Sequence, residues 1–134
     1  MAEIANFVHR NAMKITPKIL DNIMRELPLL KAEFTQINAP KFPHLVDQLE
    51  FLADAVEDFA EGQVKDLPYF AIAEAAFAMI YAHRMMDLIP DTTAEYGYAD
   101  DSAVVRSVLI RYQSEFQVYA VTTDHDWSKI TDEP

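Results

Sequence analysis

The chain has 134 residues, a formal net charge of −11 and no cysteine, and 51% of its residues are hydrophobic. This length predicts one domain with a core large enough to fold without covalent cross-links, and the absence of cysteine excludes disulfides, zinc thiolate sites and thiol nucleophiles. The acidic balance argues against nucleic-acid binding, because such proteins need a basic surface to neutralise phosphates.

Helical periodicity and helix-boundary residues account for the first third of the chain. A short amphipathic helix is expected over residues 3–13. Thr16 followed by Pro17 predicts the N-cap and first position of a second helix that extends to about residue 37. Pro28 lies inside this second helix, so a kink or a restart is expected there.

The middle of the chain predicts a third helix over residues 43–61. Its apolar residues follow one another four and three positions apart, which makes one continuous stripe on a helix. These residues are Leu45, Leu49, Leu52, Val56 and Phe59. Gly62 is expected to end this helix.

A fourth helix is predicted from Asp66, as its N-cap, with Pro68 in its first turn, to about Met86. Its most apolar part, residues 67–82, is shorter than the roughly 20 residues that span a bilayer and contains Glu74. We therefore interpret it as a core helix. A buried Glu74 would need a partner, for which Arg106 and Arg111 are candidates.

A break is expected over residues 88–99, before a last helix that starts at Ala99 or Asp100 and ends near Val121. The predicted fold is a single all-α domain, an antiparallel bundle of four or five helices over residues 1–121. Residues 122–134 are predicted to form a loose polar C-terminal tail, with Trp127 as an anchor.

Four aspartates surround the predicted break, and two interpretations of them stay open. They are Asp87, Asp91, Asp100 and Asp101. In the structural interpretation, Asp91 forms a local turn, Asp100 caps the last helix, and Gly97 permits a positive φ that turns the chain back. In the functional interpretation, the four carboxylates form a metal site for Mg²⁺ or Ca²⁺. Their spacing matches no EF-hand loop.

The same segment carries a resemblance to a known family. The apolar helix from Phe77 ends in Asp87-Leu-Ile-Pro-Asp91, and Gly97-Tyr-Ala-Asp100-Asp101 follows after a spacer. This pattern resembles the YkvA-like family, small and mostly bacterial helical proteins of unknown function, over about residues 65–112. The resemblance implies a helical fold but no established activity, so it assigns no catalytic role. The spacer and Glu74 depart from the family pattern, which argues against the membrane association suspected for some relatives.

The third predicted helix also carries an acidic stripe. Its residues lie three or four positions apart and share one helix face. They are Glu50, Asp54, Glu57, Asp58 and Glu61. The stripe is either a solvated outer face or a partner-binding surface, in which Glu50, Asp54, Glu57 and Glu61 would receive a basic partner. The segment of a second copy that contains Lys14, Lys18 and Arg25 is one such partner.

Three functions follow from these features. The leading hypothesis is a soluble, cytoplasmic and non-enzymatic interaction or regulatory module that binds a protein partner or forms a homodimer. The alternatives are a divalent-cation-binding protein with hydrolytic activity at the four aspartates, and a peripheral membrane protein that uses residues 1–37. The sequence contains neither the Glu-x-x-His pairs of di-iron bundles nor a Gly-x-Ser-x-Gly nucleophile motif.

Overall fold

The computed structural model describes residues 2–64, 66–88 and 94–134, and for residues 84–88 and 94–97 it describes the helical backbone alone. The described residues form seven helices and no strand, which confirms the predicted all-α fold class. In chain order the helices are α1 (Ala2–Ala12), α2 (Pro17–Phe34), α3 (Leu45–Ala60), α4 (Tyr69–Leu88), α5 (Ala94–Arg111), α6 (Gln113–Thr122) and α7 (Trp127–Ile130). There are more helices than the predicted four or five, because the last predicted helix is divided and the tail contains a short helix.

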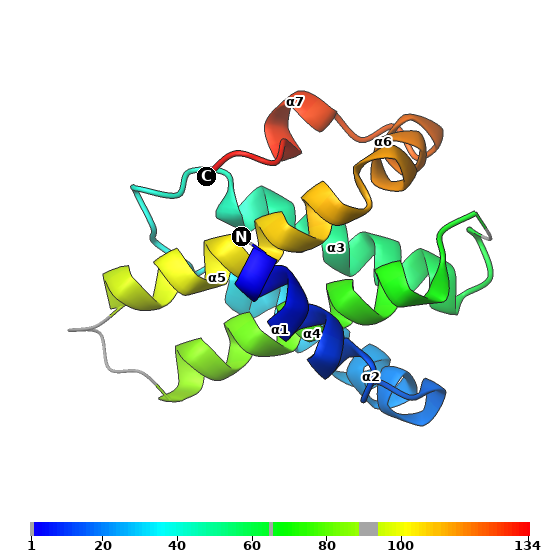
Figure 1. The fold of residues 1–134 in the computed structure, drawn as a ribbon, viewed down its shortest axis with the longest axis horizontal. Coiled ribbons are helices and arrows are strands. Elements are labelled where there is room, and N and C mark those ends of the chain that lie inside the picture. The colour runs from blue at the N-terminus through cyan, green and yellow to red at the C-terminus, as the bar shows by residue number, and fades with distance from the viewer. Residues whose placement is uncertain (1, 65, 89–93) are drawn as a thin grey trace.

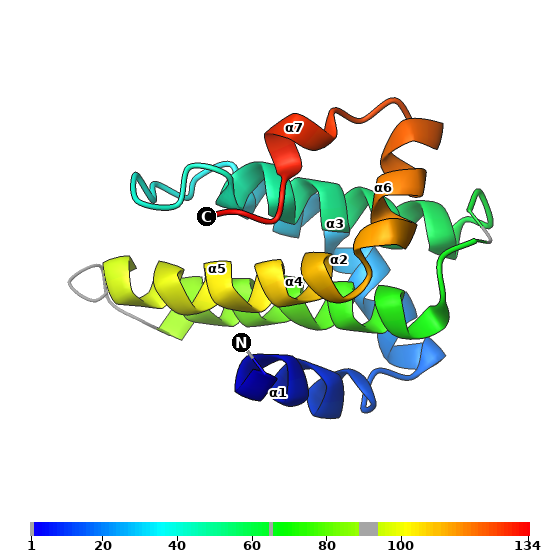
Figure 2. The same ribbon diagram turned by 45° about the horizontal axis from the view of Figure 1, so that its top comes forward.

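Helix α4 lies at the centre of the fold. It packs against α1, α2, α3 and α5, and it runs antiparallel to both α3 and α5 (Figure 1). Figure 2 shows α3 on one side of the α4–α5 pair and α1 on the other side. Every residue from 71 to 79 is buried, and five of these nine are alanines, whose small side chains let neighbouring helices approach closely. A helix that is buried on all sides needs an almost continuous apolar sequence, and α4 has one.

The start of α2 agrees with the prediction, whereas its interior does not. The Thr16 hydroxyl oxygen accepts a hydrogen bond from the Ile19 N–H at 3.2 Å, and Pro17 is the first helical residue. The predicted restart at Pro28 is wrong, because α2 continues through this residue. Pro28 is exposed, while Leu27 and Leu30 beside it are buried. The packing of these leucines holds the helix together although one backbone hydrogen bond is lost.

The apolar stripe of α3 faces the core as predicted. Leu45, Leu49, Leu52 and Val56 are completely buried, and Phe59 packs partly buried against them. After Ala60 the chain turns at Gly62, whose φ is +76°. Glycine adopts this left-handed conformation without the steric cost that other residues meet, which explains why the helix ends here.

The boundaries around the acidic break differ from the prediction. Helix α4 begins at Tyr69, so Pro68 precedes the helix instead of lying in its first turn, and Asp66 lies further upstream. Helix α5 begins at Ala94, so the predicted start at Ala99 or Asp100 is wrong. Gly97 lies inside α5 and not in a turn.

The last predicted helix is divided at Tyr112, which leaves the helical conformation between α5 and α6. Its hydroxyl group donates a hydrogen bond to the buried carboxylate of Glu74 at 3.3 Å. The need of this carboxylate for partners accounts for the position of the interruption.

The C-terminal segment is ordered, so the predicted loose tail is wrong. The Gln48 amide of α3 is completely buried, and its Nε2 lies 3.1, 3.1 and 2.8 Å from the carbonyl oxygens of residues 130, 131 and 133. Trp127 anchors the segment as predicted, since its ring meets that of Phe51 edge-on at 6.0 Å. These contacts hold α7 against α3.

Candidate functional site

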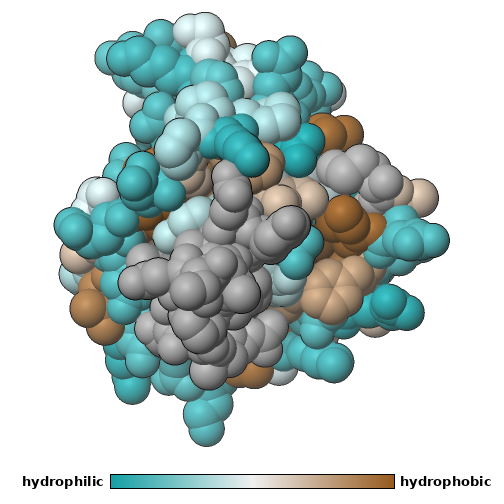
Figure 3. Space-filling view, turned by 90° about the vertical axis from the view of Figure 1, so that its left-hand side faces the viewer, coloured by the Kyte–Doolittle hydropathy of each residue, from teal (hydrophilic) through white to brown (hydrophobic). Residues whose placement is uncertain are grey.

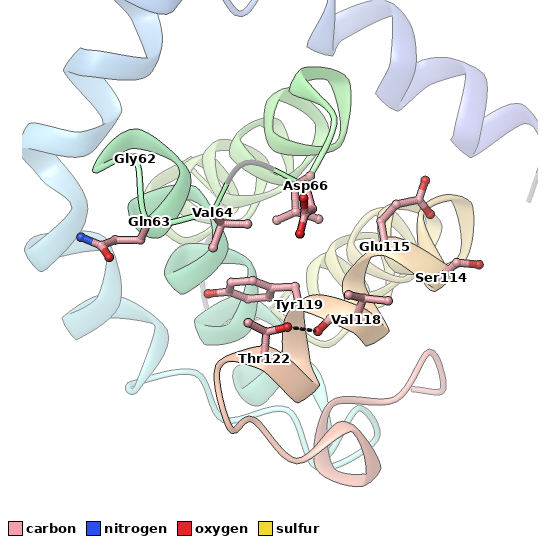
Figure 4. A pocket seen from close by; sticks show the side chains of 10 residues that line it. Gly62, Gln63, Val64, Asp66, Ser114, Glu115, Val118, Tyr119 and Thr122 are labelled. Atoms are coloured by element: carbon pink, nitrogen blue, oxygen red, sulfur yellow. Dashed lines mark hydrogen bonds between the residues drawn. The ribbon is translucent and has the colours of Figure 1, made fainter.

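A concave site with a volume of about 480 Å³ lies between the α3–α4 connection and α6. Figure 4 shows that the connection lines one wall and that α6 lines the other. The lining residues are Gly62, Gln63, Val64, Asp66, Leu67, Ser114, Glu115, Val118, Tyr119 and Thr122. We refer to this site as the α6 groove.

The floor of the α6 groove is apolar and rigid. Leu67 and Tyr119 are 3% and 2% exposed, so only their edges reach the groove. The Tyr119 hydroxyl donates a hydrogen bond to Asp58 Oδ2 at 2.6 Å, which fixes the ring. Burial, followed by this contact with Asp58, raises the pKa of Tyr119, so the phenol stays neutral. Val118 supplies apolar area that solvent can reach, because 57% of it is exposed.

The charged side chains that line the α6 groove are both acidic. Asp66 comes from the segment before α4, and Glu115 comes from the first turn of α6. No Lys, Arg or His is found among the described residues that line the groove. A low-dielectric concave surface with two carboxylates favours a cationic ligand and repels an anionic one.

Only two of the four predicted metal ligands have described side chains. Asp87 lies in the last turn of α4, where only the backbone is described, and Asp91 lies outside the described residues. Asp100 and Asp101 are neighbours in α5, where successive side chains point about 100° apart; Asp100 is exposed and Asp101 is buried. Figure 3 shows this end of the bundle, where the described residues present a mostly hydrophilic surface. Within the described part of the chain, no group of three or more His, Asp or Glu side chains could hold a metal ion.

The cap predicted at Asp100 is wrong, because α5 begins six residues earlier at Ala94, and the neighbouring Asp101 lies in the core. Its side chain is completely buried, and neither carboxyl oxygen has a hydrogen-bond partner among the residues that the structure describes. Burial, with a smaller effect from the neighbouring Asp100, raises the pKa of Asp101 to about 8. The carboxyl group is therefore mainly neutral at pH 7, and a neutral carboxyl group is a poor ligand for Mg²⁺ or Ca²⁺.

The acidic stripe of α3 is engaged within the same chain. Lys31 Nζ of α2 lies 2.9 Å from Asp54 Oδ1 and 3.2 Å from Glu57 Oε1. Burial alone would lower the pKa of Lys31, but these two carboxylates outweigh it and raise the pKa. His125 Nε2 lies 3.1 Å from the other oxygen of Asp54. Two of the four predicted partner-binding residues thus already have a basic neighbour.

The other two predicted partner-binding residues differ in exposure. Glu61 is exposed just after α3, whereas Glu50 is partly buried. Burial, and then the charges of Asp47 and Asp54, raise the pKa of Glu50. Neither residue lines the α6 groove, so the sequence-predicted surface and the groove are different sites.

Glu74 is completely buried, and it has the partner that the sequence predicts. Arg111 Nε lies 3.6 Å from its Oε2, and His9 Nδ1 approaches the same oxygen at 3.3 Å. The Tyr112 hydroxyl is the third neighbour of this oxygen, and Oε1 has no partner. The other predicted candidate, Arg106, instead donates a hydrogen bond to Ser102 Oγ at 3.1 Å. This cluster ties α1 and the end of α5 to α4.

No protein-family model, curated protein or solved structure is significantly similar to this chain. None of the helices that the structure describes is both long and apolar enough to cross a membrane.

The sequence prediction missed the α6 groove. Its two walls come from segments about 50 residues apart, and periodicity within a single helix cannot show that they meet. The available signal was Val118, which lies next to the core-facing Tyr119 but points to solvent. Exposed apolar residues are common when they occur singly, so Val118 alone would not have identified a site.

Proposed function

We propose that this protein is a non-enzymatic interaction module that binds a basic amphipathic segment of a partner protein in the α6 groove. The observation that carries this proposal is the combination of an apolar floor with two carboxylates and no described basic residue in the lining. An amphipathic helix with apolar anchors and flanking Lys or Arg residues matches both properties.

The size of the α6 groove supports a small number of anchors. A volume of about 480 Å³ is in the range of small-molecule pockets, so it would accept one or two large side chains of a partner and not a whole helix. Each apolar side chain that is fully buried contributes roughly 1.5–3 kcal/mol before the cost of association. The binding that this predicts is reversible, and Asp66 and Glu115 would mainly accelerate association and select for positive charge.

The α6 groove supports this function better than the acidic stripe of α3 does. Lys31 already contacts Asp54 and Glu57, so a partner would have to displace an intramolecular ion pair. The side chains of the α6 groove carry no such internal competitor among the described residues. The acidic stripe of α3 therefore serves mainly in contacts within the chain, through Lys31 and His125.

The proposal extends to the cellular compartment of the protein and to its family relationship. Absence of cysteine supports a reducing compartment such as the cytoplasm, and the motif around the acidic break supports a distant relationship to YkvA-like proteins. The cation-site hypothesis gains no support from Asp100 and Asp101, which lie on different sides of α5.

Fluorescence anisotropy with labelled model peptides tests the proposed function. The first peptide is an amphipathic helix with leucines at positions i, i+4 and i+7 and lysines on its flanks, and the control peptide replaces each lysine with glutamate. The basic peptide should bind, and its affinity should fall with rising salt concentration. Val118→Ser should weaken binding by about tenfold. Val121→Ser is the matched control, because Val121 is 82% exposed but does not line the groove.

Equal binding of the two peptides, or equal effects of the two substitutions, would contradict the proposal. Sedimentation analysis tests whether a second copy of the chain occupies the α6 groove instead. A self-association that Val118→Ser abolishes would mean that the groove binds its own chain and not a separate partner.

A further inference from the structure

A second cavity, of about 280 Å³, lies between the start of α1 and the second half of α5. The two helices pack against each other, on the side of the fold opposite to α3 (Figure 2). The residues that line it are Ala2, Ala5, Ser107, Ile110 and Arg111. We refer to it as the α1–α5 cavity.

Ser107 gives the α1–α5 cavity an unsatisfied hydrogen-bonding group. Its side chain is 3% exposed, and Oγ has no hydrogen-bond partner within the described part of the chain. A serine inside a helix usually donates to the carbonyl oxygen four residues earlier, and a buried hydroxyl group without a partner is unfavourable. An unpaired donor at the wall of an apolar cavity indicates a ligand that carries an acceptor.

Arg111 places a positive charge in the same wall. It follows Ser107 by four residues, so both side chains lie on one face of α5. Its Nε faces Glu74 at 3.6 Å, and the guanidinium group carries four further N–H donors. The side chain is 39% exposed, so a ligand can reach it. The planar arrangement of these donors matches a carboxylate.

We propose that the α1–α5 cavity binds a small aliphatic carboxylate. The carboxylate contacts Ser107 Oγ and the Arg111 guanidinium group, and the hydrocarbon chain lies against Ala2, Ala5 and Ile110. An apolar cavity of roughly 150 Å³ accepts benzene, so the available volume suits a chain of about six to eight carbons.

Charge separates this cavity from the α6 groove. Arg111 is the only charged residue in the lining of the α1–α5 cavity among the described residues, whereas Asp66 and Glu115 line the α6 groove. An aliphatic carboxylate would therefore avoid the α6 groove although both sites are apolar. The inference does not depend on the proposed interaction function.

The first experiment compares three probes of equal chain length by isothermal titration calorimetry: hexanoate, hexan-1-ol and hexylamine. Hexanoate should bind with saturation and raise the unfolding midpoint, and the other two should bind about tenfold more weakly or not at all. Acetate serves as a probe of anion binding without a chain. Amide shifts in the NMR spectrum should concentrate on α1 and α5.

Substitutions identify the site. Ala5→Leu fills the cavity without touching Arg111 or Glu74 and should abolish hexanoate binding. Asn6→Leu is its matched control, because Asn6 is exposed on the same helix but does not line the cavity. Ser107→Ala should weaken binding by about tenfold while the ligand-free protein stays folded, since no existing hydrogen bond is lost.

Four results would overturn the inference. Equal affinity for hexanoate and hexan-1-ol would mean that Arg111 does not contribute to binding. Equal affinity for hexanoate and acetate would mean that the apolar walls do not contribute. Hexanoate binding that survives Ala5→Leu, or amide shifts confined to α6, would place the ligand elsewhere.

Discussion

The replacement of Asp101 by asparagine should make the protein more stable at neutral pH. Asp101 is completely buried, and neither of its oxygens has a hydrogen-bond partner among the described residues. Its pKa is raised from 3.8 to about 8, mainly by burial. The unfolded chain ionises this carboxyl group near pH 4, while the folded protein keeps it protonated. Between these two pH values the folded state holds more protons, so its stability falls as the pH rises.

The size of this effect follows from the two pKa values. At about 1.4 kcal/mol per pH unit, stability should fall by about 4 kcal/mol between pH 5 and pH 8 because of this group alone. The stabilising contribution of the neutral form is complete below pH 4 and is lost once the pH reaches about 8, where Asp101 ionises in the fold as well. A total stability of roughly 5–15 kcal/mol makes this loss easy to measure.

Urea unfolding of the unmodified protein and of Asp101→Asn at pH 5, 6, 7 and 8 measures the effect. Asparagine cannot ionise, so the stability difference between the two proteins should grow with pH by about 4 kcal/mol over this range. Asp100→Asn is the control, since Asp100 is exposed and makes only the smaller contribution to the shift. If the difference between the unmodified protein and Asp101→Asn stays constant from pH 5 to pH 8, Asp101 is not a buried acid and the reasoning fails.

Two further substitutions test the other structural conclusions. Gln48→Leu keeps the volume of the side chain but removes the donor that faces three carbonyl oxygens of the C-terminal segment. It should lower the free energy of unfolding by about 1–3 kcal/mol and make residues 123–134 sensitive to limited proteolysis. An unchanged cleavage pattern would contradict this. Lys31→Met removes the ion pairs with Asp54 and Glu57, all three of which are partly exposed. It should therefore cost at most about 1 kcal/mol, and 1 M NaCl should reduce the difference from the unmodified protein. A larger, salt-independent loss would contradict the assignment as a solvent-screened ion pair, because it would mean that the pair is shielded from solvent.

The sequence predicts those features that depend on neighbouring residues. Thr16 and Pro17 mark the start of α2 because the cap and the first turn are local. Gly62 ends α3 for the same reason, through its positive φ. The apolar stripe of α3 is predicted from spacing alone, since one apolar face of a helix is enough to define its buried side.

The errors occur where distant contacts outweigh local preferences. Gly97 is an unfavourable helix residue, yet α5 extends past it to Ala94, and packing against α4 can compensate for such a cost. The C-terminal segment reads as loose because its composition is polar. It is ordered because Gln48, 82 or more positions earlier, bonds to its backbone. No local pattern indicates that a glutamine on α3 is buried.

Some polar groups of this fold are buried without full hydrogen bonding. Among the described residues, Gln48, Glu74, Asp101 and Ser107 each have a buried side-chain oxygen without a partner, and the last three lie on the α4–α5 pair. Core positions of this kind are more stable with apolar residues. Ser107 lines a cavity, whereas Asp101 lies nearer the start of the same helix. If stability alone determined these positions, alanine or leucine would serve better at each. A double substitution that replaces both Asp101 and Ser107 by apolar residues should thus raise the free energy of unfolding. A loss of hexanoate binding in the same protein would connect the unfavourable burial of these groups to ligand recognition.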